Sequence, residues 1–139
     1  SPPYFNVERY SYDDTQSWVR YKNIDAWNKE FLHKTIANVW PTLKKGGILA
    51  INIADVYAKS NDREKGYVEI TNPMNDYIKS LGAEYEGCLG MEMAKRPGSA
   101  GAGAIIEGDE GRYTEEALAK AEEARGKRFC EPMWVWKKL

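Results

Sequence analysis

The chain has 139 residues, of which 42% are hydrophobic and 29% charged; this predicts one soluble globular domain and excludes a disordered chain or two full domains. Its formal net charge of −1 excludes a general electrostatic attraction to nucleic acid. The longest apolar run, residues 48–54, is too short to cross a membrane, and the first residues do not resemble a secretion leader. We therefore expect a cytoplasmic protein without a membrane partner.

The first five residues, Ser-Pro-Pro-Tyr-Phe, are the most informative stretch. Two consecutive prolines restrict the backbone and remove two N–H donors, so the stretch is stiff and its carbonyl oxygens stay available as acceptors. Tyr4 places a flat ring directly after them. Acceptors beside a flat ring suit a planar group that carries an amine. The same letters also occur in disordered linkers and in polyproline ligands, which remain an alternative for the stretch alone.

Residues 6–23 are rich in aromatic and polar side chains and show no sustained helical or strand period. The rings of Tyr10, Tyr12, Trp18 and Tyr21 have two possible uses. They could cap a flipped base or line a cofactor pocket, because unstacked bases are held by stacking on aromatic rings. They could equally pack on the helix that follows, as part of a surface connection.

A helix is predicted from about residue 25 to residue 40. Asp25 is the expected N-cap, and apolar residues recur at helical spacing from Trp27 onward. The Lys-Lys-Gly-Gly turn at 44–47 combines the cations and the glycines that suit a helix end. His33 falls opposite the apolar stripe, so we expect it to be solvent-exposed and without a catalytic role.

The next segment, residues 47–55, is the clearest predicted strand. It is apolar on both faces, which is typical of a central strand in a parallel sheet that is covered on both sides. Asn52 and Asp55 lie near its carboxyl end, where open α/β sheets bind ligands. Asp55 is either a cap or turn residue, or it lines the pocket near the substrate.

The rest of the chain predicts a polar loop over residues 56–71, a helix from Thr71 or Asn72 to about Leu81, and a strand at 83–93. Strict alternation places Tyr85 and Leu89 on the same face of that strand. Residues 96–128 are expected to form a loop and helix insertion, and a final strand is expected to begin at residue 129. Trp134 and Trp136 share one face of it, and the two strands that flank the insertion are expected to pair.

The opening Ser1–Tyr4 resembles motif IV, [DNS]PP[YFW], of the S-adenosylmethionine-dependent amino-methyltransferases, which methylate exocyclic amines of adenine or cytosine in DNA. The order of the elements from Phe5 to Asp55 is similar to the segment that follows this motif. The resemblance covers about residues 1–95 and 129–139. It implies an α/β fold in which residues 1–139 form a single partial methyltransferase domain. The predicted strands would be the fifth, sixth and seventh of a Rossmann-like sheet, the last two antiparallel, with flanking helices.

The same resemblance implies how the site would work. Ser1, Pro2, Pro3 and Tyr4 would be catalytic: the Ser1 side chain and the Pro2 carbonyl accept hydrogen bonds from the amine, and Tyr4 stacks on the flipped base. Further substrate contacts are expected from Phe5, Asn6, Asn52 and Asp55. The implied cofactor is S-adenosylmethionine, with only Ser1 and Pro2 as contacts, because the chain has no Phe-x-Gly-x-Gly loop. No metal is expected.

DNA, through one flipped base, is the implied partner, and serine at the first motif position favours cytosine N4 over adenine N6. An RNA or protein amino-methyltransferase is the second reading. A noncatalytic remnant or interaction module is the third, favoured by the missing cofactor loop. We expect this loop to lie upstream or downstream, and the chain alone to be inactive. The edge of strand 48–54 would then be exposed and would promote self-association.

Overall fold

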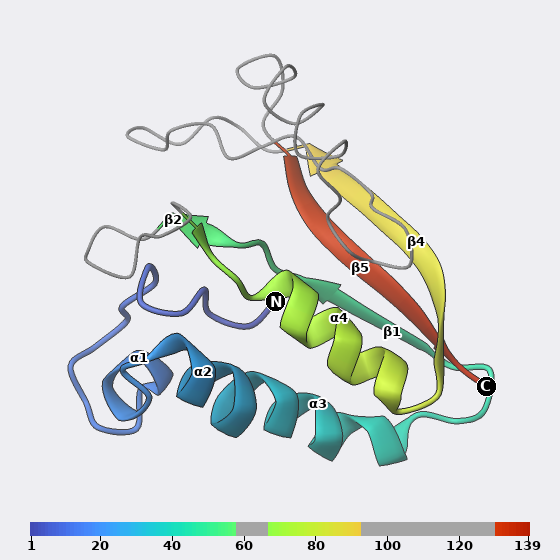
Figure 1. Ribbon diagram of the computed structural model, residues 1–139, viewed down its shortest axis with the longest axis horizontal. Coiled ribbons are helices and arrows are strands. Elements are labelled where there is room, and N and C mark those ends of the chain that lie inside the picture. The colour runs from blue at the N-terminus through green and yellow to red at the C-terminus, as the bar shows by residue number, and fades with distance from the viewer. Residues whose placement is uncertain (58–66, 93–129) are drawn as a thin grey trace.

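The computed structural model describes residues 1–57, 67–92 and 130–139 (Figure 1). The predicted insertion at 96–128 lies outside the described residues. An irregular segment leads into the helices and strands, whose bounds are α1 (Ser17–Arg20), α2 (Ile24–Trp27), the π-helical segment η1 (Asn28–His33), α3 (Lys34–Val39), the 3-10 turn η2 (Trp40–Thr42), β1 (Ile48–Asn52), β2 (Val56–Tyr57), β3 (Tyr67–Val68), α4 (Thr71–Ser80), β4 (Ala83–Glu92) and β5 (Cys130–Lys138).

Three of the strands form an antiparallel sheet in the order β1-β5-β4. The predicted pairing of the two strands around the insertion is confirmed, because β4 pairs with β5. The prediction that β1 is a central, parallel strand covered on both faces is wrong. Leu49 and Ile51 are buried, whereas Ile48 and Ala50 face outward, and Ile48 is 49% exposed. An apolar run alone does not distinguish a strand buried on both faces from an edge strand whose outer face is apolar.

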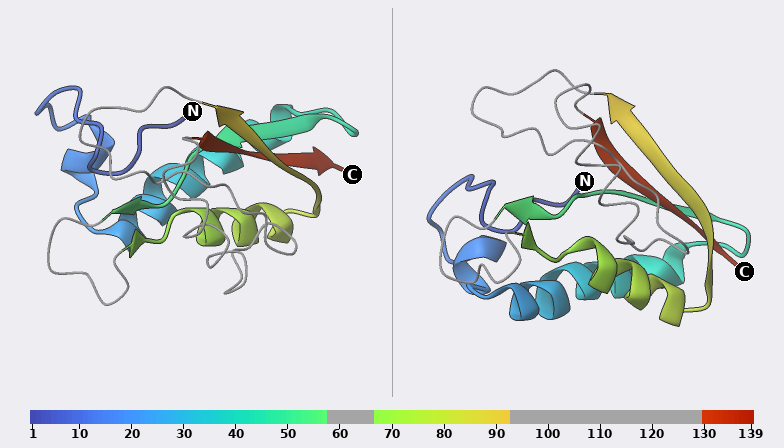
Figure 2. Two further views of the ribbon diagram at one scale, coloured as in Figure 1. Left: turned by 90° about the horizontal axis from the view of Figure 1, so that it is seen from above. Right: turned by 45° about the horizontal axis from the view of Figure 1, so that its top comes forward.

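The core lies between this sheet and two helical segments. The helix from α2 to η2 and the helix α4 lie side by side on one side of the sheet (Figures 1 and 2). Trp134 and Trp136 point into this layer and are fully buried, which confirms their predicted common face. Both indole N–H groups have partners, since Trp134 Nε1 donates to the Ile53 carbonyl at 2.9 Å and Trp136 Nε1 to Asn75 Oδ1 at 3.1 Å.

The long helix begins earlier than predicted and contains an irregular turn. Its N-cap is Asn23, whose side chain accepts a hydrogen bond from the Ala26 amide at 2.8 Å, so the choice of Asp25 was wrong. The π-helical segment η1 adds a residue to one turn, so Trp27 and Leu32, five apart, are both buried. The same irregularity rotates His33 toward α4.

The prediction that His33 is solvent-exposed is therefore wrong. Its ring is half-buried and stacks on the Tyr77 ring of α4, with centroids 4.6 Å apart and planes 3° from parallel. Burial lowers the pKa of His33, and the nearby positive charge of Lys29 lowers it further, while a hydrogen bond to the Pro73 carbonyl acts in the opposite direction. A 3.6-residue period could not place His33 at this interface, because the period changes at η1.

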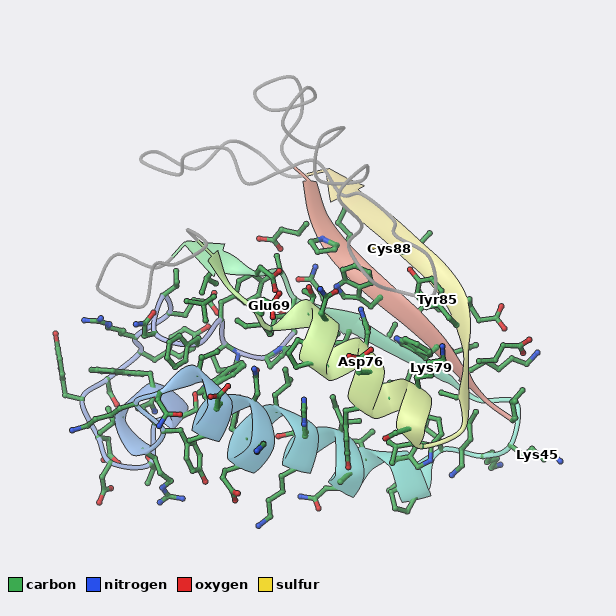
Figure 3. All side chains as sticks on the ribbon, in the orientation of Figure 1. Lys45, Glu69, Asp76, Lys79, Tyr85 and Cys88 are labelled. Carbon is green, nitrogen blue, oxygen red and sulfur yellow. The ribbon has the colours of Figure 1, made fainter. Side chains whose placement is uncertain are left out.

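A bulge between Tyr85 and Gly87 interrupts β4. Tyr85 and Cys88, labelled in Figure 3, both pack on the core, whereas Leu89 is 61% exposed. The prediction that Tyr85 and Leu89 share a face is therefore wrong, because one extra residue reverses the alternation beyond it. The predicted loop over 56–71 also contains β2 and β3, which pair with each other. Within the described residues, no helix is long and apolar enough to cross a membrane.

Candidate functional site

The Pro-Pro-Tyr-Phe stretch forms a tight turn. The Phe5 amide donates to the Pro3 carbonyl at 3.1 Å, and the Val7 amide donates to the Tyr4 carbonyl at 2.9 Å. The Tyr4 amide donates to the Glu8 carboxylate, also at 2.9 Å. These bonds satisfy the donors that remain after the two prolines, and so hold Tyr4 in place.

Phe5 anchors this turn in the core. Its φ is 42°, a left-handed conformation that costs an L-residue roughly 1–2 kcal/mol. The side chain is only 6% exposed and meets Trp27 edge-to-face, with ring centroids 5.8 Å apart. Burial of the ring holds the strained backbone in place. Phe5 was predicted to contact substrate, but here it packs in the core and positions its neighbours.

Asn52, the last residue of β1, brings the motif and the sheet together. Its Nδ2 donates to the Pro132 carbonyl at 2.9 Å, which fixes the orientation of the amide. Its Oδ1 then lies 3.5 Å from Ser1 Oγ and 3.4 Å from the Tyr4 hydroxyl. Two predicted catalytic residues and one predicted substrate contact are thus joined. We call Ser1, Tyr4 and Asn52 the motif cluster.

The two hydroxyl contacts in the motif cluster are long, because strong hydroxyl hydrogen bonds are about 2.7–2.8 Å. A ligand can therefore displace them at little cost. The carbonyls differ as well: those of Pro3 and Tyr4 accept bonds inside the turn, whereas no donor among the described residues reaches the Pro2 carbonyl. This corner of the molecule thus offers neutral oxygen acceptors beside the Tyr4 ring, which is a suitable environment for an amino group.

Asp55 has a different role from the motif cluster. Its Oδ1 accepts hydrogen bonds from the Ile70 and Thr71 amides, both at 2.8 Å, and from the Thr71 hydroxyl at 3.0 Å. Asp55 therefore caps the start of α4, which has no cap from its own preceding residue, so the predicted cap at Thr71 or Asn72 was wrong. Burial raises the pKa of Asp55, and its three hydrogen bonds only partly offset that effect.

Asn6 has an exposed side chain, and its carbonyl accepts a hydrogen bond from Arg9 Nε at 2.9 Å. No contact joins its side chain to the motif cluster among the residues that the structure describes. Sequence reasoning missed Pro132, whose carbonyl orients Asn52 from 80 positions away. The only available signal was a proline that follows the insertion in a predicted strand, and such a proline does not identify its partner.

Comparison with known proteins gives no matching family model, no matching curated protein and no matching solved structure. The chemistry of the motif cluster is therefore the basis for the functional proposal. Hydroxyl, amide and peptide oxygens can hold an amine by its N–H donors and can stabilise positive charge that develops on the nitrogen. They lie at the carboxyl end of β1, next to the first residues of β5.

Proposed function

We propose that the chain is part of an S-adenosylmethionine-dependent methyltransferase that modifies an exocyclic amino group of a DNA base, cytosine N4 or adenine N6. The observation that carries the proposal is the convergence of Ser1 and Tyr4 on Asn52 at the end of β1. Ser1 is 51 positions away from Asn52 in the sequence, and Tyr4 is 48 positions away from it. A disordered linker or a polyproline ligand does not need such a contact.

The fold supports the same proposal in three ways. Helices and strands are mixed, as in an α/β domain; a long helix precedes β1; and the last two strands, β4 and β5, are antiparallel. These features are compatible with the end of a Rossmann-like sheet. We place the protein in the cytoplasm as part of this proposal.

In the proposed reaction, the amino group donates hydrogen bonds to Ser1 Oγ and to the Pro2 carbonyl, while the Ser1 hydroxyl continues to donate to Asn52 Oδ1. Asn52 Oδ1 keeps the Ser1 hydroxyl oriented, and the Pro132 carbonyl keeps Asn52 oriented. This arrangement directs the nitrogen lone pair and stabilises the positive charge that grows on it. The Tyr4 ring stacks on the base. Catalysis is then mainly positioning, and no strong general base is required.

The oxygen-rich motif cluster also suits the positive sulfonium group of S-adenosylmethionine, which supplies the methyl group when bound. Ser1 and Pro2 are the residues of this chain that would contact it. The described residues include no glycine-rich loop to hold the rest of the cofactor. We therefore assign the amine-binding role to the motif cluster and, as the resemblance implies, place most cofactor contacts outside the described residues.

The test is transfer of a labelled methyl group by the full-length protein to DNA, RNA and protein acceptors. Tyr4→Phe removes one hydroxyl and keeps the ring, whereas Asn52→Ala removes the residue on which the hydroxyls converge. We expect Asn52→Ala to lower kcat about 100-fold, the effect of losing one preorganised polar group, and Tyr4→Phe to have a smaller effect. The exposed Asn38→Ala on α3 is the matched control.

Thermal unfolding of each variant separates a catalytic defect from a folding defect. Equal activity of Asn52→Ala and Asn38→Ala would rule out the motif cluster as the site. Transfer to RNA or protein but not DNA would favour the second reading of the sequence. Absence of transfer to all three acceptors, with folded protein, would favour the noncatalytic remnant.

A further inference from the structure

A cluster of exposed rings lies directly after the motif. We define the stacking loop as Arg9, Tyr10, Tyr12 and Trp18. Tyr10 is 73% exposed and Tyr12 is 83% exposed. The Arg9 guanidinium lies 4.8 Å above the centre of the Trp18 ring, and Tyr12 meets the same indole edge-to-face at 5.5 Å. Three of the four side chains therefore pack on one another on the outside of the protein.

Hydrogen bonds hold two members of the stacking loop, Arg9 and Trp18, in this arrangement. Trp18 Nε1 donates to the Ser11 carbonyl at 3.2 Å, and Arg9 Nε donates to the Asn6 carbonyl at 2.9 Å. Side chains that are already ordered lose little conformational entropy when they bind a flat ligand. This low entropy cost favours binding. Packing on the rest of the protein was the other predicted use of the rings in residues 6–23. Tyr21 does pack against the core, whereas the exposure of Tyr10 and Tyr12 argues against this use for those two rings.

The stacking loop adjoins the motif cluster. Glu8, which accepts a hydrogen bond from the Tyr4 amide, immediately precedes Arg9. The surrounding segment, residues 6–22, has three acidic residues (Glu8, Asp13, Asp14) and three basic ones (Arg9, Arg20, Lys22), so its net charge is zero. A neutral surface with exposed rings suits uncharged nucleobases better than it suits phosphates.

We propose that the stacking loop binds unpaired nucleobases next to the base that the motif cluster holds. The inference rests on the proposed function, because it assigns the loop to the same nucleic-acid partner. Bases stack on Tyr10 and Tyr12, and Arg9 contributes its one charge from above Trp18. Stacking of this kind tolerates different sequences, because every base has a flat face.

The test is fluorescence anisotropy of a labelled oligodeoxythymidine about 12 nucleotides long, bound by the full-length protein. We expect the double variant Tyr10→Ala/Tyr12→Ala to bind at least about tenfold more weakly, whereas Tyr10→Phe/Tyr12→Phe keeps the rings and binds like the wild type. Leu89→Ala, which removes an exposed apolar side chain on β4, is the control. Because a single cation takes part, raising salt from about 50 to about 200 mM should weaken binding only about threefold.

Several results would overturn the proposal. The first is that the wild type does not bind the oligonucleotide, which would favour a protein partner for the rings. The second is that the Ala double variant binds as tightly as Leu89→Ala. The third is that binding weakens about 100-fold over the same salt range. The methylation assay reports on the proposed function separately. A protein that binds through the rings but transfers no methyl group contradicts the proposed function alone.

Discussion

Two regions of this protein are rich in aromatic residues, and their environments are opposite. In β5, Trp134 and Trp136 are fully buried and both indole N–H groups have protein acceptors. In the stacking loop, Tyr10 and Tyr12 are exposed for most of their surface. Both regions are rich in aromatic residues, but only β5 is paired with a strand on each side and covered by helices on one face. Aromatic content therefore does not indicate burial, whereas the alternation within β5 correctly placed its two tryptophans on one face.

The largest expected effect is on stability at β5. Trp134→Ala removes a fully buried indole and should lower the free energy of unfolding by about 3–5 kcal/mol, whereas Tyr12→Ala should change it by no more than about 0.5 kcal/mol. Urea unfolding followed by circular dichroism measures both. Trp134→Phe keeps a ring but leaves the Ile53 carbonyl without its donor, so its effect should be intermediate. Equal effects of Trp134→Ala and Tyr12→Ala would eliminate the contrast between the two regions.

A smaller effect is expected at Asp55, which links the end of β1 to α4. Asp55→Ala removes the cap of α4 and should cost about 1–2 kcal/mol, whereas Asp55→Asn can still accept from the Ile70 and Thr71 amides and should cost less. Thermal unfolding of both variants checks this. If instead Asp55→Asn keeps stability but loses methyl transfer, Asp55 also contacts substrate.

The same residue gives a pH dependence. Because the folded pKa of Asp55 is raised above its ordinary value of 3.8, the folded state holds the proton more tightly than the unfolded state does. The resulting stabilisation is present below pH 3.8 and is lost as the pH rises through the folded pKa. We expect Asp55→Asn to remove this contribution from a stability profile measured by urea unfolding. An unchanged profile would contradict the assignment.

The ring of His33 is half-buried, so its degree of burial is intermediate between those of the two aromatic regions. Its folded pKa is below the ordinary value of 6.5, so the unfolded state takes up the proton first as the pH falls. Stability should therefore be lost between pH 6.5 and the lower folded pKa. His33→Phe keeps the stack on Tyr77 and should abolish that loss in urea unfolding at several pH values. Persistence of the loss in His33→Phe would show that another group is responsible.

The smallest expected effect concerns the open edge of β1, which pairs only with β5 among the described strands. We propose that two copies associate weakly through this edge, because its five residues include no charge and no proline. Ala50→Lys places a cation on the exposed face and should shift the protein toward the monomer in sedimentation velocity, whereas Asn38→Lys on α3 should not. A monomer at high concentration for the wild type would contradict this proposal.

Much of the local structure could be predicted from the sequence. The long helix, the helix before Gly82 and the common face of the two tryptophans follow from short-range periodicity and from turn residues. The apolar run predicted a strand over residues 47–55, of which residues 48–52 form β1. The stretch predicted to be stiff at the two prolines is held in a tight turn, and Asn52, expected near the carboxyl end of its strand, lies there beside Ser1 and Tyr4. These features depend on neighbouring residues or on a strand end, which sequence patterns report well.

Only the tertiary structure decided the rest. The edge position of β1 depends on β5, about 80 residues later. The bulge in β4 and the π-helical turn change the strand and helix periods from which the faces of Leu89 and His33 were predicted. Asp55 caps a helix that begins 16 residues further on. Pattern reasoning sees the spacing within one element, whereas pairing order, caps from other segments and irregular turns are settled by the packing of distant residues. That is the physical reason why the sequence alone determined the elements and the tertiary structure determined the site that they form.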